Sequence, residues 1–275
     1  MKTFIRRLGN KSRYLNQLLI HVPSNYDTYI EPFVGSGALF LRLRPQKWII
    51  NDTCNDIMNV WCSVKTSHIQ IISSLIAFSK VFINLSRDQK TKTCRELLQL
   101  MQKLPFDTKR AVLFIILTYC VYAGSIIKNN QYYFTGLDLS LSKTAPIYFL
   151  SDKYFKNLNI VQEFLITTTG RLYNKDYTYI LKKAKQNDFV FLDPPYVEMR
   201  RTNVQYNINE LIDENFLLSF ASEVDKLNDK GVKFLITQPD VNIVRELFAK
   251  YNIKTFEVYR RYRNGFDNEL IITNY

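Results

Sequence analysis

The sequence predicts an α/β fold with a mixed sheet whose central strands are parallel. Residues 189–192 form a short apolar run bounded by turn-forming residues, which is typical of a strand buried at the centre of a parallel sheet. Residues 28–43 read as a strand, a glycine-containing loop and an apolar helix, the nucleotide-binding turn of Rossmann-like folds. Toward the C-terminus, helix patterns (213–227, 241–251) alternate with strand patterns (232–237, 254–259, 269–273).

Composition and charge narrow the class of protein. The net charge of +12 over 275 residues favours a polyanionic partner. The four cysteines contain no CxxC pair and the two histidines stand apart, so we expect no metal site and no disulfide scaffold, as in intracellular proteins. The most apolar stretch, residues 111–123, is too short to cross a bilayer, and no secretory signal is visible. We therefore expect a cytoplasmic protein without a membrane partner.

The predicted strand 189–192 ends in Asp193, Pro194, Pro195 and Tyr196. Proline cannot donate a ladder hydrogen bond and fixes its own φ, so the strand must stop there. Asp193 and Tyr196 are then presented stiffly at the carboxyl end of the sheet, where open α/β folds bind ligands. Such a segment can position a flat polar substrate. The alternative is that Asp193 caps a turn and Tyr196 belongs to the core.

The loop between residues 31 and 37 precedes the predicted helix 38–43. Its glycines would let a ligand approach the backbone closely, although a GxG alone is weak evidence. Residues 48–51 read as the next strand and place Asp52 about 20 residues after Glu31, where an acidic side chain accepts hydrogen bonds from ribose hydroxyls. Asp52 can equally act as the N-cap of the following helix.

Two resemblances connect these segments. An apolar strand followed by Asp-Pro-Pro-Tyr resembles the signature of amino-group methyltransferases that use S-adenosylmethionine. The order of Gly9-Asn10-Lys11, the Glu31–Phe40 segment, Asp52 and then Asp193–Tyr196 resembles the Dam-like DNA adenine-N6 methyltransferases (D12 class, alpha group) over nearly the whole chain. The resemblance implies a Rossmann-like methyltransferase fold, S-adenosylmethionine as cofactor and double-stranded DNA as partner.

The implied chemistry assigns roles to the Asp-Pro-Pro-Tyr segment. Asp193 and the carbonyl of Pro194 would accept the two N–H groups of an adenine amine and make its nitrogen more nucleophilic, while Tyr196 would stack on the flipped base. The resemblance also implies a set of cofactor-binding residues: Arg7, Lys11, Glu31, Pro32, Phe33, Gly35, Ser36, Gly37, Asp52, Asp176, Tyr177 and Asp193. Arg7 stands where the family often has an aromatic residue. Locally, Asp176 is as good a helix N-cap as a cofactor ligand.

The middle of the chain is expected to hold a mainly helical insertion. Helical patterns span residues 57–83, 86–104 and 107–123, and a β-hairpin follows around residues 128–135. The resemblance implies a target-recognition domain at 58–145 and a discontinuous catalytic domain at 1–57 and 146–275, in which we expect a strand at 164–168. The candidate DNA contacts are Lys128, Asn129, Asn130 and Gln131 in the hairpin, and Arg200 and Arg201 after Tyr196. A solvated surface hairpin is the alternative.

Other functions stay open at this point. Related enzymes methylate RNA bases or a protein glutamine amide, but the motif order and the long insertion favour DNA. A catalytically silent DNA- or cofactor-binding homologue is a second alternative, against which the intact loop and the intact Asp-Pro-Pro-Tyr argue. A cognate restriction endonuclease is a further candidate partner, and the oligomeric state is open. Members that read GATC carry an arginine where Leu137 follows Gly136, so GATC recognition is not implied.

Overall fold

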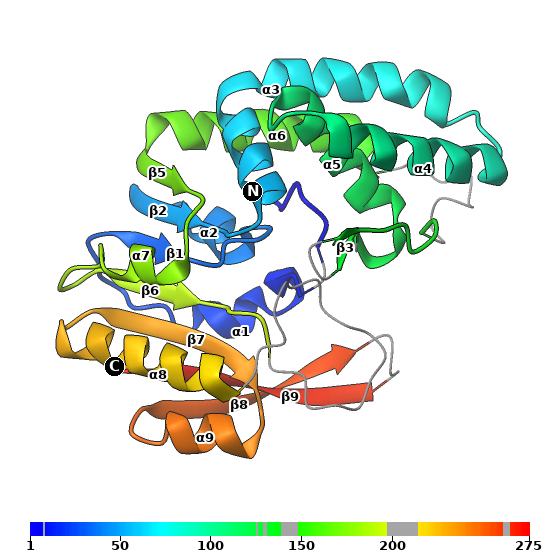
Figure 1. Cartoon of the computed structure of the whole chain (residues 1–275). Helices are drawn as coiled ribbons and strands as arrows, with labels where there is room; N and C mark the ends of the chain where they lie inside the picture. Colours follow the sequence, from blue (N-terminus) through cyan, green and yellow to red (C-terminus); the bar gives the residue numbers. More distant parts are fainter. Residues whose placement is uncertain (8, 125, 129–130, 139–147, 197–213, 261–264) are drawn as a thin grey trace.

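The structure is a computed structural model, and it describes residues 1–7, 9–124, 126–128, 131–138, 148–196, 214–260 and 265–275 (Figure 1). In this part of the chain, seven strands form one sheet in the order β5-β2-β1-β6-β7-β9-β8. Their bounds are β1 Tyr29–Glu31, β2 Lys47–Asn51, β5 Thr169–Tyr173, β6 Phe189–Leu192, β7 Lys233–Pro239, β8 Asn252–Arg260 and β9 Gly265–Thr273. The first five strands of that order are mutually parallel, and β9 is antiparallel to both neighbours. The predicted mixed sheet with a parallel centre is confirmed.

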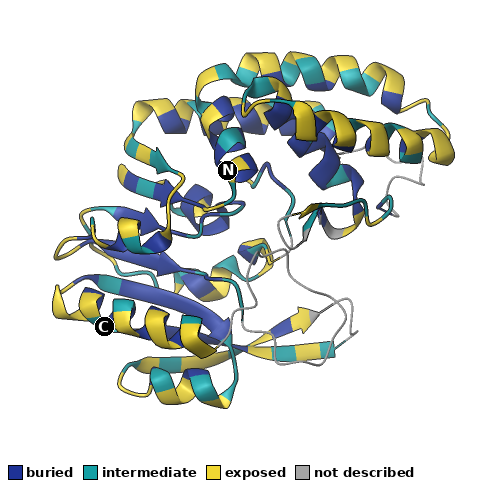
Figure 2. Ribbon diagram, viewed as in Figure 1, coloured by how far each residue is buried: buried dark blue, intermediate teal, exposed yellow. Residues whose placement is uncertain are grey.

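Helices cover both faces of this sheet (Figures 1 and 2). They are α1 Leu15–Leu19, α2 Ala38–Leu43, α3 Asn55–Phe82, α4 Arg87–Lys103, α5 Thr108–Cys120, α6 Asp152–Thr167, α7 Tyr177–Leu181, α8 Glu214–Asp229 and α9 Asn242–Leu247. Strand β6 is buried throughout and its side chains alternate between two cores. Phe189 and Phe191 belong to the core that includes residues of α2, α3, α5 and α6, whereas Val190 and Leu192 belong to the core that includes residues of α7, α8 and α9.

Helices α3, α4 and α5 form the middle of the chain, as predicted. Ser86 caps α4 through a capping box with Gln89, and Asp107 caps α5 by accepting the amide of Arg110. The predicted hairpin is also present, with β3 Ile127–Lys128 antiparallel to β4 Gln131–Tyr132. Helix α3 runs without interruption across residue 58, so the division of the chain into a catalytic and a recognition domain stays a prediction. None of the described helices is long and apolar enough to cross a membrane.

The predicted strand at residues 164–168 is wrong. Helix α6 continues to Thr167, and the strand that follows it is β5 Thr169–Tyr173. The buried positions Leu158, Val161, Phe164 and Leu165 lie on one helical face against α3, and this packing outweighs the local strand preference of the β-branched residues at 166–169. Helix α9 is also shorter than predicted, and strands β8 and β9 are longer.

Candidate active site

A cavity of about 510 Å³ lies at the carboxyl ends of β1, β2 and β6. Its walls come from the loop of residues 32–37, here called the glycine loop, from the start of α3, from the β3–β4 hairpin and from the segment after β6. Of the residues predicted from the sequence, it brings together Arg7, Lys11, Glu31, Phe33, Gly35, Ser36, Asp52, Asp176, Tyr177, Asp193, Pro194, Pro195 and Tyr196. Pro32 and Gly37 do not line it. The carbonyl of Pro32 accepts a hydrogen bond from Asn51, and Gly37 lies against Trp61.

The glycine loop has a shape that only small residues permit. Gly35 and Gly37 have φ angles of 46° and 65°, in the left-handed region. A Cβ at Gly37 would also come within 2.6 Å of the Trp61 ring. The indole N–H of Trp61 donates to the carbonyl of Gly35 at 3.1 Å, and the Gly35 amide donates to Asp52 Oδ2 at 2.9 Å. The loop is therefore fastened to α3 and to the end of β2.

Asp52 bridges two backbone segments at the edge of the cavity. Besides Gly35, its carboxylate accepts the amide of Cys54 at 2.9 Å, so it organises the turn into α3. Each carboxylate oxygen has two acceptor positions, which leaves capacity toward the cavity. Asn51, directly before it, holds the loop that follows β5 by exchanging hydrogen bonds with the backbone of Lys175. No local sequence pattern indicates this role of Asn51, because it depends on the pairing of β2 with β5.

An aromatic group borders the cavity on the side of α7. The ring centroids of Phe33 and Tyr177 are 5.3 Å apart, and those of Tyr177 and Phe216 are 5.8 Å apart. Asp176 lines the cavity and also accepts the amide of Thr178, so it is the N-cap of α7. Both sequence interpretations of Asp176 are thus compatible with its position, because the cap uses Oδ1 and an acceptor position remains on the other oxygen.

Asp193 is held by two side chains at the end of β6. Its Oδ1 lies 2.8 Å from Nζ of Lys11 and accepts the hydroxyl of Thr237 at 2.7 Å. Lys11 is 7% exposed and begins a short 3-10 helix whose N-cap is Asn10. Burial raises the pKa of the Asp193 carboxyl, and the Lys11 ammonium opposes this rise. A partly buried carboxylate beside an ammonium can hold a polar substrate group through its remaining acceptor positions.

Tyr196 is fixed at its hydroxyl end. The phenol donates to Oε2 of Glu269 at 2.8 Å, and the Lys11 ammonium lies 4.7 Å from the ring centroid. Burial, together with the negative charges of Glu269 and Asp193, raises the pKa of Tyr196 well above its usual value, so the phenol stays protonated and donates. Thr237 and Glu269 are not among the site residues predicted from the sequence. A glutamate at the start of the apolar run 269–272 was the available signal for Glu269.

Glu31, at the end of β1, is a buried carboxylate. Its Oε2 accepts the hydroxyl of Tyr29 at 2.7 Å, and only 2% of its surface is exposed. Burial raises the pKa of Glu31 well above its usual value, and the Tyr29 hydrogen bond opposes this rise only in part. Within the described ranges, no three His, Cys, Asp or Glu side chains lie close enough to hold a metal ion.

The predicted DNA contacts are described only in part. Gln131 is exposed in β4, and Lys128 belongs to β3. Asn129, Asn130, Arg200 and Arg201 lie outside the described residues. The residues that line the cavity but were not predicted from the sequence include Asp56, Phe106 and Tyr132.

Comparison with known proteins identifies the family of the chain. The model of the D12 class N6 adenine-specific DNA methyltransferase family matches residues 8–262. The chain is 24% identical to the Type II methyltransferase M1.LlaDCHI of Lactococcus lactis subsp. cremoris, over 100% of this chain and 96% of the relative. It is 25% identical to the Type II methyltransferase M.MjaIII of Methanocaldococcus jannaschii, over 100% and 99%. It is 22% identical to the DNA adenine methylase of Escherichia coli K12, over 94% and 88%. The chain therefore belongs to the D12 class of N6 adenine-specific DNA methyltransferases.

Proposed function

We propose that the protein transfers a methyl group from S-adenosylmethionine to N6 of an adenine that is flipped out of duplex DNA at a short recognition sequence. The observation that carries the proposal is the shared cavity. Asp193, at the end of β6, and the glycine loop after β1 line the same space. An acceptor for an exocyclic amine and a backbone cradle for a nucleoside are thereby adjacent, as transfer between two bound molecules requires.

The cavity suits the cofactor in size and charge. Its volume of about 510 Å³ falls in the range typical of small-molecule sites. Although the chain is strongly basic, Glu31, Asp52 and Asp176 face this cavity, and their carboxylates suit a cationic ligand that carries hydroxyl groups. S-adenosylmethionine, when bound, supplies an electrophilic methyl group on a positively charged sulfur.

The residues that would hold the cofactor divide by type. Gly35, Ser36 and Gly37, with Pro32 before them, shape a backbone that a ligand can approach closely. Asp52 would accept ribose hydroxyls, and Phe33 and Tyr177 offer a face to a purine. Arg7 and Lys11 enclose the cavity from the N-terminal segment.

The residues that would hold the base are those after β6. Asp193 and the carbonyl of Pro194 would accept the two N6 hydrogens, which orients the nitrogen lone pair and increases its nucleophilicity. Pro195 stiffens the segment, and the Tyr196 ring would stack on the base while Glu269 holds its hydroxyl. Thr237 and Lys11 keep the Asp193 carboxylate in place before the base arrives.

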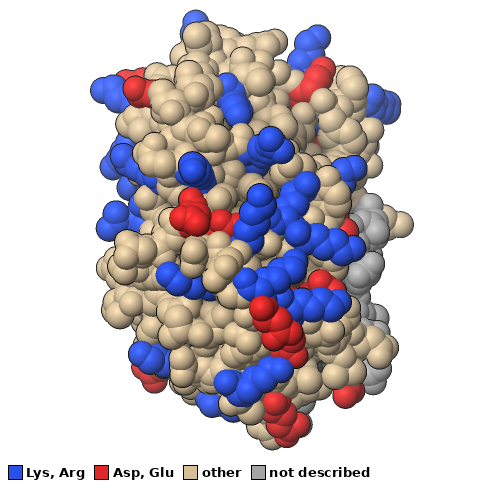
Figure 3. All heavy atoms as spheres, turned by 90° about the vertical axis from the view of Figure 1, so that its left-hand side faces the viewer, with Lys and Arg blue, Asp and Glu red and all other residues tan. Residues whose placement is uncertain are grey.

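The DNA contacts belong to the same proposal. We place them on the hairpin residues Lys128, Asn129, Asn130 and Gln131 and on Arg200 and Arg201, within the proposed division into a recognition domain and a discontinuous catalytic domain. Lys and Arg side chains are widespread on the face at the left of Figure 1, where Asp and Glu are fewer, whereas the β3–β4 hairpin lies right of centre in that view (Figures 1 and 3). Such a surface supports non-specific attraction to a polyanion. The relatives' names divide between Type II methyltransferases and DNA adenine methylases, so a cognate endonuclease stays a candidate partner.

The test is transfer of labelled methyl from S-adenosylmethionine to unmethylated duplex DNA, with single-base mapping of the product. We expect N6-methyladenine at a short recurring sequence. Asp193→Ala should lose transfer while cofactor binding stays measurable. Asp240→Ala is the matched control, because Asp240 follows the neighbouring strand β7 and pairs with Arg245 outside the cavity. Methylated RNA or protein, or bound cofactor without transfer, would replace the proposal with one of the alternatives.

A further inference from the structure

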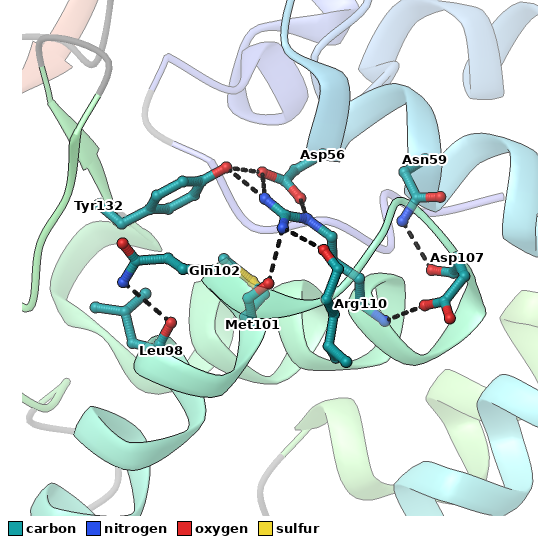
Figure 4. Close-up of polar contacts among 9 residues, drawn as sticks. Asp56, Asn59, Leu98, Met101, Gln102, Asp107, Arg110 and Tyr132 are labelled. Carbon is teal, nitrogen blue, oxygen red and sulfur yellow. Dashed lines mark hydrogen bonds and ion pairs between the residues drawn. The ribbon is translucent and has the colours of Figure 1, made fainter.

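Three side chains that are far apart in the sequence meet beside the cavity (Figure 4). Asp56 lies in the first turn of α3, Arg110 in the first turn of α5 and Tyr132 in β4. Arg110 Nε donates to Asp56 Oδ1 at 2.6 Å, and Arg110 Nη2 donates to Asp56 Oδ2 at 3.2 Å and to the Tyr132 hydroxyl at 2.7 Å. The Tyr132 hydroxyl in turn donates to Asp56 Oδ2. We call these residues the Asp56–Arg110–Tyr132 cluster.

Arg110 is fully used as a hydrogen-bond donor. Its Nη1 donates to the carbonyls of Met101 and Leu104 at the end of α4, at 2.8 and 2.9 Å. With the three bonds to Asp56 and Tyr132, all five guanidinium N–H groups have an acceptor. The side chains of Arg110 and Asp56 are 5% and 1% exposed. One buried guanidinium therefore joins α3, α4, α5 and the hairpin.

The hydroxyl of Tyr132 is the part of this cluster that reaches the hairpin. Arg110 already satisfies the Asp56 carboxylate through two bonds, so the ion pair does not require the tyrosine. In the described residues, by contrast, the β3–β4 hairpin has two ladder pairs, Ile127–Tyr132 and Lys128–Gln131, and one further backbone hydrogen bond from Tyr133 to Ile126. A two-stranded ribbon this short is not stable alone. Its position therefore depends on contacts at its base, and Tyr132 supplies one of them.

The cluster also adjoins the proposed cofactor loop. Asp56 and Tyr132 line the cavity. Asp52 holds the amides of Gly35 and Cys54, two residues before Asp56, so the glycine loop and the hairpin are attached to the same first turn of α3. The hairpin and the glycine loop thus share one attachment point at the edge of the cavity.

We propose that the Asp56–Arg110–Tyr132 cluster positions the β3–β4 hairpin relative to the catalytic cavity, so that duplex DNA engaged by the hairpin is in register with the base site at Asp193. The part of this inference that concerns DNA rests on the proposed function. Arg110 and Tyr132 are positioning residues here, since they act through the hairpin and not on the reacting atoms. They set how readily DNA is engaged, and they leave the transfer step itself unaltered.

Tyr132→Phe is the sharpest variant, because it removes the hydroxyl and keeps both the ring and the Asp56–Arg110 ion pair. Tyr251→Phe is its matched control, since the Tyr251 hydroxyl donates to Asp225 at 2.7 Å, away from the cavity. The first readout is hydrogen–deuterium exchange of peptides from residues 131–135, measured without DNA. The second is the division of effects between KM for DNA and kcat, on a duplex containing the mapped site.

We expect faster hairpin exchange in Tyr132→Phe and a rise in KM for DNA of about tenfold, the scale of one hydrogen bond to a charged group, with kcat within about twofold of wild type. Tyr251→Phe should match wild type in both readouts, even where it lowers the melting temperature equally. Wild-type exchange in Tyr132→Phe, or faster exchange with an unchanged KM, would overturn the inference. A wild-type protein that methylates no DNA would instead contradict the proposed function, and the exchange readout would still decide whether Tyr132 holds the hairpin.

Discussion

Lys11 Nζ lies 2.8 Å from Oδ1 of Asp193, so the carboxylate proposed to receive the adenine amine is already paired with an ammonium from the N-terminal segment. Lys11 comes from a 3-10 helix far from β6 in the sequence, and the pair forms inside the cavity. The ammonium favours the ionised form of Asp193, whereas burial disfavours it. Lys11 therefore keeps the carboxylate available as a hydrogen-bond acceptor.

Replacing Lys11 by methionine should shift the pH dependence of methyl transfer. Burial raises the pKa of Asp193 and Lys11 lowers it, so loss of the ammonium raises that pKa further. The protonated carboxyl donates and no longer accepts through that oxygen. As the pH falls, the variant should therefore lose activity at a higher pH than wild type does. The measurement is kcat from pH 5 to 9 for both proteins. Lys250→Met, which breaks the Lys250–Asp225 surface pair, serves as control. If kcat fell at the same acid pH in Lys11→Met and in wild type, Lys11 would not set the charge of Asp193.

Glu31→Gln should stabilise the protein at alkaline pH and not at acid pH. The folded-state pKa of Glu31 is raised above the usual 4.5, chiefly by burial, so folding favours the protonated form. The stability that this group contributes is present below pH 4.5 and is lost as the pH rises through the raised pKa. A neutral glutamine avoids that loss and can still accept from Tyr29. The melting temperature of the variant should exceed that of wild type at pH 8, and the difference should shrink toward pH 4.5.

The same variant, Glu31→Gln, should bind the cofactor more weakly than wild type. Glu31 lines the cavity, so its replacement should weaken binding of the cationic cofactor while the fold becomes more stable. Isothermal titration with S-adenosylmethionine at pH 8 checks this. Equal gains in melting temperature at pH 8 and pH 4.5 would indicate that titration of Glu31 is not the cause.

The sequence predicts the bounds of those segments whose conformation depends mainly on residues nearby in the chain. Strand β6 and helix α2 have the predicted bounds, because an apolar run between turn residues and a helix after a glycine loop are local patterns. Residues 164–168 were misread as a strand because their helical conformation depends on packing against α3, which no local pattern contains.

The site residues also divide into those that local patterns predict and those that only the tertiary structure brings to the site. The positions of Asp193 and Asp52 follow from where their own strands end. Thr237 and Glu269 reach the site only because β7 and β9 lie beside β6 in the sheet, an order that the sequence does not state. Arg110 is similar, since a basic residue at the start of an apolar helix gives no indication that it will be buried against Asp56.

The two loop glycines should differ in their tolerance of alanine. At Gly35 the added Cβ meets only Arg7, at 3.8 Å, so the cost is the left-handed backbone, about 1–2 kcal/mol. At Gly37 the same backbone cost is joined by contact with Trp61 at 2.6 Å, and overpacking adds about 1–3 kcal/mol. Urea unfolding should therefore rank wild type above Gly35→Ala and Gly35→Ala above Gly37→Ala. Equal losses in the two variants would contradict the close packing of Gly37 on Trp61.

Removing the hydroxyl of Tyr196 and removing its ring should have different effects on stability and on KM for DNA. Tyr196→Phe keeps the stacking face and removes the donor to Glu269, so we expect loss of about 1–3 kcal/mol of stability and little change in KM for DNA. Tyr196→Ala also removes the stack, which typically contributes about 1–3 kcal/mol per base, so KM for DNA should rise roughly 10- to 100-fold. Steady-state kinetics on the mapped duplex and urea unfolding of both variants provide the comparison. If Tyr196→Phe raised KM as much as Tyr196→Ala, the hydroxyl and not the ring would be the contact with the base.

Arg110→Met should be the most destabilising single substitution in the Asp56–Arg110–Tyr132 cluster. It leaves the Asp56 carboxylate buried without its cation, and it removes the donors to the carbonyls of Met101 and Leu104, so we expect a loss of about 3–5 kcal/mol. Replacing both charges, as in Asp56→Leu with Arg110→Met, should recover much of this loss, since a buried ion pair adds little net stability over apolar side chains of similar volume. A double-mutant cycle by urea unfolding measures the coupling. Additive losses would mean that the pair does not interact as its 2.6 Å separation indicates.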